Sequence, residues 1–284
     1  MAAPDKERPG FPLWRHSKSE RKPFLFNASL LPLTEIGRSR SMSEIAVFLS
    51  WRMFYKDTKV DVERSNKDQM AHLSSALIIP DSLLAKEATD LLREHSTDLL
   101  FNHSIRVYLF AAEQGRQRKL RFDAELLYVA AAFHDFGLIQ KFSSADERFE
   151  VDGANAARQF LTAHEVPEEQ IETAWQAIAL HTTPGVTQYM RPEVTLLYSG
   201  VGLDVLGRGF DQFPSELREK IVAEYPRKHF KENFIREYFA GFAHKPGTTY
   251  GTVNASICER FIPGYKAPNA VDVIAASPFP DSDY

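Results

Sequence analysis

The stretch LLYVAAAFHDFGL, from Leu126 to Leu138, decides the fold and points to the site. Nearly every residue before His134 is apolar, so the segment predicts a helix that is buried on all sides. The helix ends on an imidazole and a carboxylate, His134 and Asp135. Burying Asp135 there costs several kcal/mol unless a cation or a donor pairs with it. The stretch therefore predicts both a core helix and a partner for Asp135.

From Pro80 onward the pattern of apolar residues is helical. They recur at steps of three and four residues between polar capping residues, and strand-like alternation is scarce. The fold class that this pattern predicts is all-α. The expected helices begin at Asp81, at Thr97 (ending at Gly115), at Asp123 (ending at Gly137), at Asp152 and at Pro167 (ending at His181). Later ones span about Glu193–Leu206 and Ser215–Tyr225, and an aromatic-rich helix carries Phe230, Phe234, Tyr238 and Phe242.

Composition divides the chain into three parts. Residues 1–75 mix Pro, Ser, Arg and Lys with short apolar patches, and we expect an N-terminal extension whose structure the sequence leaves open. Residues 76–265 carry the helical pattern and form the predicted domain. Residues 266–284 are rich in Pro, Asp and Ser, which is typical of an extended tail.

The bulk properties narrow the class of function. The chain has 284 residues, 44% of them apolar, and a net charge of −4, which argues against a nucleic-acid partner. It has no apolar run long enough for a membrane span, and Cys258 is its single cysteine. We expect a cytoplasmic protein that acts on a small molecule, with a homo-oligomer left open.

Four side chains form the candidate metal site. His103 faces the buried side of its helix, His134 and Asp135 end the next one, and Asp204 places a carboxylate in a later apolar stripe. One divalent cation would neutralise both carboxylates and accept both imidazoles. Zinc is the expected metal, although iron, manganese and cobalt accept the same donors. The alternative for Asp204 is a salt bridge to Arg106.

Three sequence blocks carry a family resemblance: FNHSIRVYLFA (101–111), AAFHDFG (131–137) and LLYSGVGLDVLG (196–207). The order His, His-Asp, Asp resembles the HD-domain metal-dependent hydrolase superfamily, and the blocks are similar to those of cyanamide hydratases within it. Further similar blocks are RFEVDGANAA (148–157), AIALHTT (177–183) and FAHKPGTTYG (242–251). The resemblance implies an HD-domain helical bundle with His103, His134, Asp135 and Asp204 as metal ligands.

The chain departs from the two-metal members of this superfamily. Those members carry an extra histidine just before a Gly-Ala helix start, where this chain has Glu150. The next family histidine matches His181. The resemblance therefore implies one metal per chain, with Glu150 and His181 beside its open coordination position. Either residue could serve as the acid or base, because adding water to a C≡N carbon requires a proton on nitrogen.

The resemblance implies a hydratase for a small nitrile, with cyanamide converted to urea. We expect Phe133, Phe136 and Tyr198 to line a confined substrate pocket. The alternative is an HD-type phosphohydrolase, which would need several Arg or Lys side chains around the metal. A third alternative is a catalytically silent HD module that binds a ligand or a protein partner.

Overall fold

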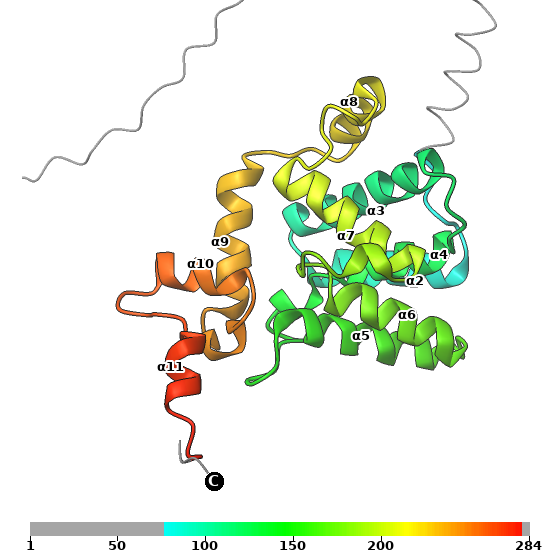
Figure 1. Cartoon of the computed structure of the whole chain (residues 1–284). Coiled ribbons are helices and arrows are strands. Elements are labelled where there is room, and N and C mark those ends of the chain that lie inside the picture. Colours follow the sequence, from blue (N-terminus) through cyan, green and yellow to red (C-terminus); the bar gives the residue numbers. More distant parts are fainter. Residues whose placement is uncertain (1–76, 280–284) are drawn as a thin grey trace, which may run out of the picture. The chain divides into compact units, whose positions relative to one another are not determined.

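The computed structural model describes residues 77–279 of the chain, which lie within a compact unit of residues 61–284 (Figure 1). These residues contain helices and loops and no strand, so the predicted all-α class is confirmed. The predicted extension, residues 1–75, lies outside the described residues.

Helices make up the whole described architecture, as the sequence predicted. The first half of the described chain contains α2 (Leu83–His95), α3 (Asp98–Gln117), α4 (Ala124–Phe133), η1 (Phe136–Leu138), α5 (Phe149–Ala163) and α6 (Glu168–Ala179). The later ones are η2 (Thr187–Tyr189), α7 (Pro192–Leu206), α8 (Ser215–Glu224), α9 (Phe230–Phe242), η3 (Pro246–Thr249), α10 (Asn254–Phe261) and α11 (Ala270–Ala275).

Side-chain caps fix where the first three helices begin. The Thr97 hydroxyl accepts a hydrogen bond from the Leu100 amide, and the Asp123 carboxylate caps α4, so both predicted starts are confirmed. The first helix is capped by Ser82, which corrects the prediction of Asp81.

Two glycines expected to end helices have a packing role instead. Helix α3 continues past Gly115, where an added Cβ would lie 2.6 Å from the Phe122 ring. Helix α4 already ends at Phe133, and Gly137 lies inside η1, where an added Cβ would lie 1.9 Å from the Phe149 carbonyl oxygen. Gly137 needs glycine because a backbone carbonyl approaches too closely for any side chain, whereas a side chain at Gly115 would require the Phe122 and Leu196 side chains to shift.

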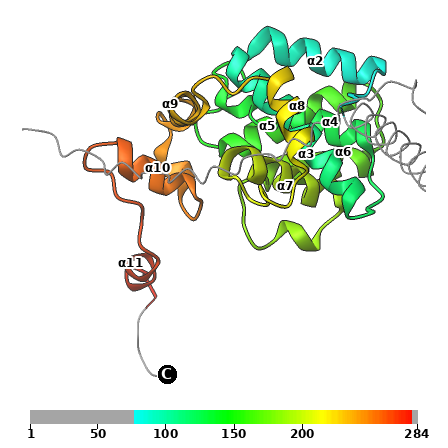
Figure 2. The ribbon, with the colours of Figure 1, turned by 90° about the horizontal axis from the view of Figure 1, so that it is seen from above.

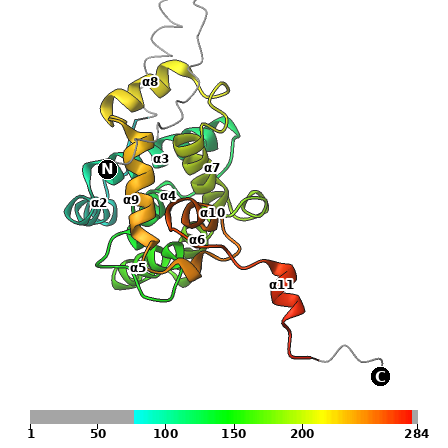
Figure 3. The ribbon, with the colours of Figure 1, turned by 90° about the vertical axis from the view of Figure 1, so that its left-hand side faces the viewer.

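Two other expectations are also corrected. Helix α5 begins at Phe149, so Asp152 lies inside its first turn and does not cap it. The Asp152 carboxylate instead forms a buried ion pair with Lys245 and accepts a hydrogen bond from the Ser144 amide. The C-terminal tail, predicted to be extended, contains the short helix α11, which has no buried residue and projects away from the bundle in Figures 1 and 3.

The core forms around α4, whose residues 126–133 are all buried. Helices α3 and α7 cross beside it at very short range, which is possible because Gly200 has no side chain. An added Cβ at Gly200 would lie 2.4 Å from the Val107 carbonyl oxygen. This close approach brings Asp204 of α7 beside His103 of α3. The crossing therefore sets the geometry of the candidate site.

A second apolar cluster joins the C-terminal helices to the bundle. Phe234, Tyr238 and Phe242 of α9 pack with Phe149 and with Cys258 of α10. Figure 2 shows α9 and α10 beside the bundle, and Figure 3 is seen from the side that they cover. Among the described residues, no helix combines the length and apolar character that crossing a bilayer requires.

Candidate metal centre

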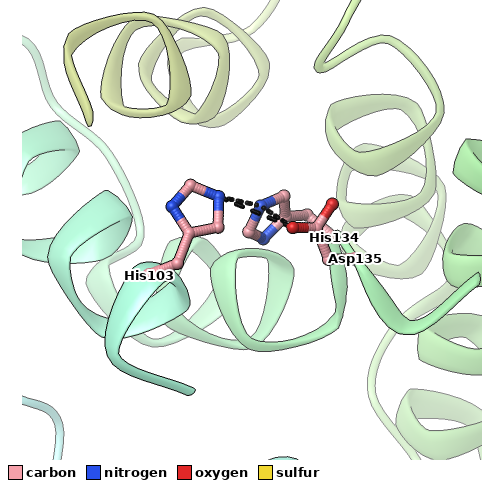
Figure 4. A group of neighbouring side chains, drawn as sticks. All are labelled: His103, His134 and Asp135. Atoms are coloured by element: carbon pink, nitrogen blue, oxygen red, sulfur yellow. Dashed lines mark hydrogen bonds and ion pairs between the residues drawn. The ribbon is translucent and has the colours of Figure 1, made fainter. Parts of the chain in front are cut away.

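Three buried side chains from neighbouring helices meet at one point: His103, His134 and Asp135 (Figure 4). His103 comes from the middle of α3, His134 directly follows α4, and Asp135 precedes η1. None of the three is more than 4% exposed. Their convergence follows from the end of α4, which delivers two adjacent ligating residues opposite the buried face of α3.

Hydrogen bonds orient both imidazole rings. His103 Nδ1 donates to Asp204 Oδ2 at 2.7 Å, and His134 Nδ1 donates to the Ala131 carbonyl oxygen at 2.8 Å. These partners assign the ring proton to Nδ1 in each neutral histidine and leave a lone pair on each Nε2. The two Nε2 atoms face each other at 3.1 Å, so a proton or a metal cation is needed between them.

The separations of the donor atoms fit a single cation. Asp135 Oδ2 lies 3.5 Å from His103 Nε2 and 3.3 Å from His134 Nε2. Ligand atoms about 2.0–2.2 Å from one metal ion lie roughly 2.8–3.6 Å apart at bond angles of about 90–110°. Asp135 Oδ2 is buried and has no hydrogen-bond partner among the described residues. This donor set and its unpaired oxygen indicate a divalent metal site.

The electrostatics keep the ligands in the states that bind a cation. Burial alone would raise the pKa of Asp135, but the charge of His134 and His103 lowers it below its usual range. Burial lowers the pKa of His103. Burial would also lower the pKa of His134, yet the neighbouring Asp135 charge raises it. Asp135 is thus ionised, and His134 attracts a positive charge, whether proton or metal.

Asp204 lies outside this group of three. Its carboxylate accepts the His103 Nδ1 proton and two hydrogen bonds from Arg106, at 2.8 Å each, and also pairs with Arg227. The alternative salt bridge to Arg106 is therefore present. The short α3–α7 crossing places Asp204 at the Nδ1 edge of His103, whereas the group of three meets at the opposite edge. The predicted role of Asp204 as a fourth metal ligand stays a prediction.

His181 does reach the site. Its Nδ1 donates to the Ile178 carbonyl oxygen at 2.6 Å, which leaves the Nε2 lone pair 3.8 Å from Asp135 Oδ1. Its ring lies edge-on to His134, with the centroids 5.0 Å apart. Burial and the adjacent His134 charge lower the pKa of His181 to about 4. His181 is therefore neutral at pH 7, with its acceptor nitrogen aimed at the triad.

Glu150 is also buried, but its carboxylate is fully engaged. It accepts hydrogen bonds from Thr182 at 2.5 Å and Asn254 at 3.0 Å, and it pairs with Arg148 at 3.1 Å. Burial alone would raise the pKa of Glu150, but the hydrogen bond from Arg148 lowers it. The role of Asn254 was missed, because no sequence signal links residues 104 positions apart.

A pocket of about 510 Å³ opens above the triad. His103, His134, Asp135 and His181 form its polar floor, and Thr182 and Tyr198 line it as well. Tyr198 is thus where the sequence predicted it.

The two phenylalanines predicted to line the pocket do not reach it. Phe133 and Phe136 are at most 2% exposed and stack on each other, with ring centroids 4.3 Å apart. Phe133 also packs on Phe160 of α5. Although both flank the His134-Asp135 pair in sequence, their rings point into the helical core rather than toward the pocket.

Comparison with known proteins adds one match. Residues 100–229 match the family model described as HD domain, and that span contains the triad, His181 and Asp204. No curated protein matches the chain. An HD domain with a buried His, His-Asp cluster indicates metal-dependent chemistry of the hydrolase type. The match and the triad together support the assignment of this helical segment to the HD-domain superfamily.

Proposed function

We propose that the protein is a metal-dependent hydratase that adds water to the C≡N carbon of a nitrile to give an amide. The observation that carries the proposal is the meeting of three imidazole lone pairs and an unpaired carboxylate oxygen at the floor of one pocket. The HD-domain match supports the metal-dependent class, and the resemblance of the sequence blocks to cyanamide hydratases supports the nitrile.

In this proposal His103, His134 and Asp135 hold the cation, with zinc the first choice for nitrogen and oxygen donors. When bound, such a cation would lower the pKa of a water molecule to near neutrality and polarise the nitrile. Asp204 is a positioning residue: its hydrogen bond to His103 Nδ1 fixes the ring so that Nε2 points at the cation. Arg106 and Arg227 in turn hold the Asp204 carboxylate.

We assign the proton transfer to His181. As oxygen bonds to the nitrile carbon and one C–N π bond breaks, the water loses a proton and the nitrogen gains one. The free Nε2 of His181 faces the triad from the pocket floor, so it can accept the first proton and deliver it to nitrogen. This addition gives the imidic acid R–C(OH)=NH, whose hydroxyl proton then moves to nitrogen, so the overall balance is R–C≡N plus H₂O giving R–CONH₂.

Glu150 supports this machinery from outside the pocket. It contacts two residues at the pocket floor. The Thr182 hydroxyl donates a hydrogen bond to it, and its negative charge acts to raise the pKa of His181. Since all its oxygens are engaged and it does not line the pocket, we propose that it positions the segment of His181 and Thr182 rather than transferring protons itself.

The phosphohydrolase alternative needs cationic side chains around the metal. The loop residues Lys141, Arg148 and Arg191, which could have supplied them, contact His95, Glu150 and Glu169 instead. Among the described residues that line the pocket, the lysines and arginines are Lys231 and Arg208, both exposed. This distribution favours an uncharged substrate.

The test uses the purified full chain. Elemental analysis should give about one divalent metal ion per chain, and the metal-replete protein should convert nitriles to amides without releasing phosphate from nucleotides. Phosphate release without hydration would establish the alternative enzyme class. A protein that is folded and carries no metal after growth and purification with added zinc would instead support the silent HD module.

A further inference from the structure

The size of the pocket exceeds what cyanamide requires. Cyanamide has three heavy atoms, so at roughly 30 Å³ for each water-sized group it fills about a fifth of the space. The pocket encloses about 510 Å³, which lies in the usual range for sites that bind drug-sized ligands. Most of the space above the polar floor is therefore open to a larger group.

The walls of the pocket identify that group as carbon-rich. Helix α7 contributes Val201 and Val205, α9 contributes Phe234 and Ile235, and α10 contributes Ile257. None of these side chains can hydrogen-bond to the amino group of cyanamide. Each methylene group of a substrate buried against such walls strengthens binding by about fourfold.

The rim continues the same chemistry. Leu206, Ile235 and Val253 line the pocket and are 63%, 45% and 48% exposed. They come from α7, α9 and the residue before α10, so their gathering at one opening extends the apolar wall to the surface. The cationic groups of the pocket, Arg208 and Lys231, are exposed, and Arg208 also contacts the Tyr198 hydroxyl and ring. The interior between floor and rim is thus mostly apolar.

Resting on the function proposed above, we propose that the substrate is an aliphatic or aryl-aliphatic nitrile whose apolar group has roughly five to ten carbon atoms. The nitrile lies at the floor beside His181, and the carbon chain runs between α7 and α9 toward Val253. Cyanamide and acetonitrile occupy the floor alone, so they bind weakly.

The first test measures binding without catalysis. Straight-chain amides from acetamide to hexanamide are titrated into the metal-loaded full chain by calorimetry. We expect the dissociation constant to fall by about fourfold for each added methylene, which gives roughly 250-fold across the series. A dissociation constant that does not change with chain length would overturn the proposal.

The second test narrows the pocket. Val205→Phe fills the wall near the middle, and Val253→Trp covers the rim at a half-exposed position that tolerates a larger side chain. In both variants the ratio of kcat/KM for hexanenitrile to that for acetonitrile should fall at least tenfold. Val271→Trp, on exposed helix α11 and away from the pocket, is the matched control and should leave the ratio unchanged. An unchanged ratio in both pocket variants also counts against the proposal.

The two proposals fail in different ways. If short nitriles are hydrated and amide affinity does not grow with chain length, the hydratase stands and the carbon-rich substrate is wrong. If amide affinity grows with chain length and no nitrile is hydrated, the apolar pocket stands and the hydratase is wrong.

Discussion

Two buried aspartates lie on opposite sides of the His103 ring, and their surroundings differ completely. Asp204, at the Nδ1 side, has both oxygens bound by His103, Arg106 and Arg227. Asp135, at the Nε2 side, has an oxygen without a hydrogen-bond partner among the described residues, close to two imidazole lone pairs. One carboxylate is satisfied by the protein itself, and the other needs a cation.

The difference separates two kinds of buried charge that look alike in sequence. A carboxylate compensated by arginine holds other groups in place, and its cost of burial is met inside the fold. A carboxylate left unpaired beside histidine nitrogens is compensated only when a proton or a metal ion binds to those nitrogens. The same substitution at the two aspartates should therefore have different consequences.

The largest effect is expected at Asp135. Asp135→Asn removes the charge that attracts the cation and should reduce the metal content to background, with nitrile hydration falling below detection. Mass-spectrometric metal analysis and an amide-release assay measure both. A variant that keeps a full complement of metal would show that Asp135 is not a ligand.

His181→Gln should separate turnover from metal binding. If His181 transfers the proton, kcat should fall by about 10²–10⁴-fold while the metal content stays at the wild-type level. Glu150→Gln keeps the size of that side chain and should cost less, because Glu150 only positions Thr182 and its neighbours. A larger loss of kcat in the Glu150 variant would reverse these two assignments.

Asp204→Asn makes the comparison with Asp135 direct. We expect metal affinity to fall by about 10–100-fold, the usual cost of losing the partner of a ligating histidine. The unfolding free energy should also fall by about 3 kcal/mol, because Arg106 is left buried without its counter-charge. Competition with a zinc-binding dye and urea denaturation measure the two effects. If Asp204 were itself a ligand, its metal loss would equal that of Asp135→Asn.

The sequence predicted the elements of the fold better than their contacts. The helical period and the caps Thr97 and Asp123 are local signals, so the all-α class and these helix starts followed directly. The His103, His134 and Asp135 cluster also followed, because each lies on a face that periodicity assigns to the interior.

The sequence could not predict which way each buried side chain points or which neighbour it meets. Asp204 and Asp135 are both buried acids near His103, and only the α3–α7 crossing decides which ring edge Asp204 meets. Phe133 adjoins His134 in sequence, yet successive helical residues point about 100° apart, so its ring enters the core. The wall from α9 and α10 depends on long-range packing that no local pattern encodes.

A fourth prediction concerns pH and the metal-free protein. The pKa of His181 is about 4 in the folded protein and about 6.5 in the unfolded chain. Between these two pH values only the unfolded chain takes up this proton. Stability is therefore lost as the pH falls, by about 2 kcal/mol from pH 7.5 to pH 5 for this group. His134, Asp135 and Glu150 face it and contribute to the shift.

Denaturation of wild-type and His181→Gln proteins, both stripped of metal, isolates this contribution. The variant should lose less stability between the two pH values, because it lacks the contribution of His181. The contribution of His103, whose pKa is also lowered, remains in both proteins and cancels in the comparison. Equal slopes would mean that His181 takes up its proton in the folded state.

The smallest effect is expected at His164, which matches His181 in its backbone contact and differs in its surroundings. Its Nδ1 donates to the Phe160 carbonyl oxygen at the end of α5, as His181 does to Ile178, but its Nε2 meets Glu87 in a part-exposed pair. His164→Gln should leave metal content and kcat unchanged and alter the unfolding free energy by no more than about 1 kcal/mol.

The sign of its pH dependence should be opposite to that of His181. The Phe160 carbonyl and Glu87 raise the pKa of His164, so its stabilising effect is complete below the unfolded pKa of about 6.5 and is lost as the pH rises. The cost of His164→Gln should thus appear at pH 6 and vanish by pH 8. A loss of metal or turnover in this variant would mean that position at a helix end, rather than contact with the triad, decides which histidines matter.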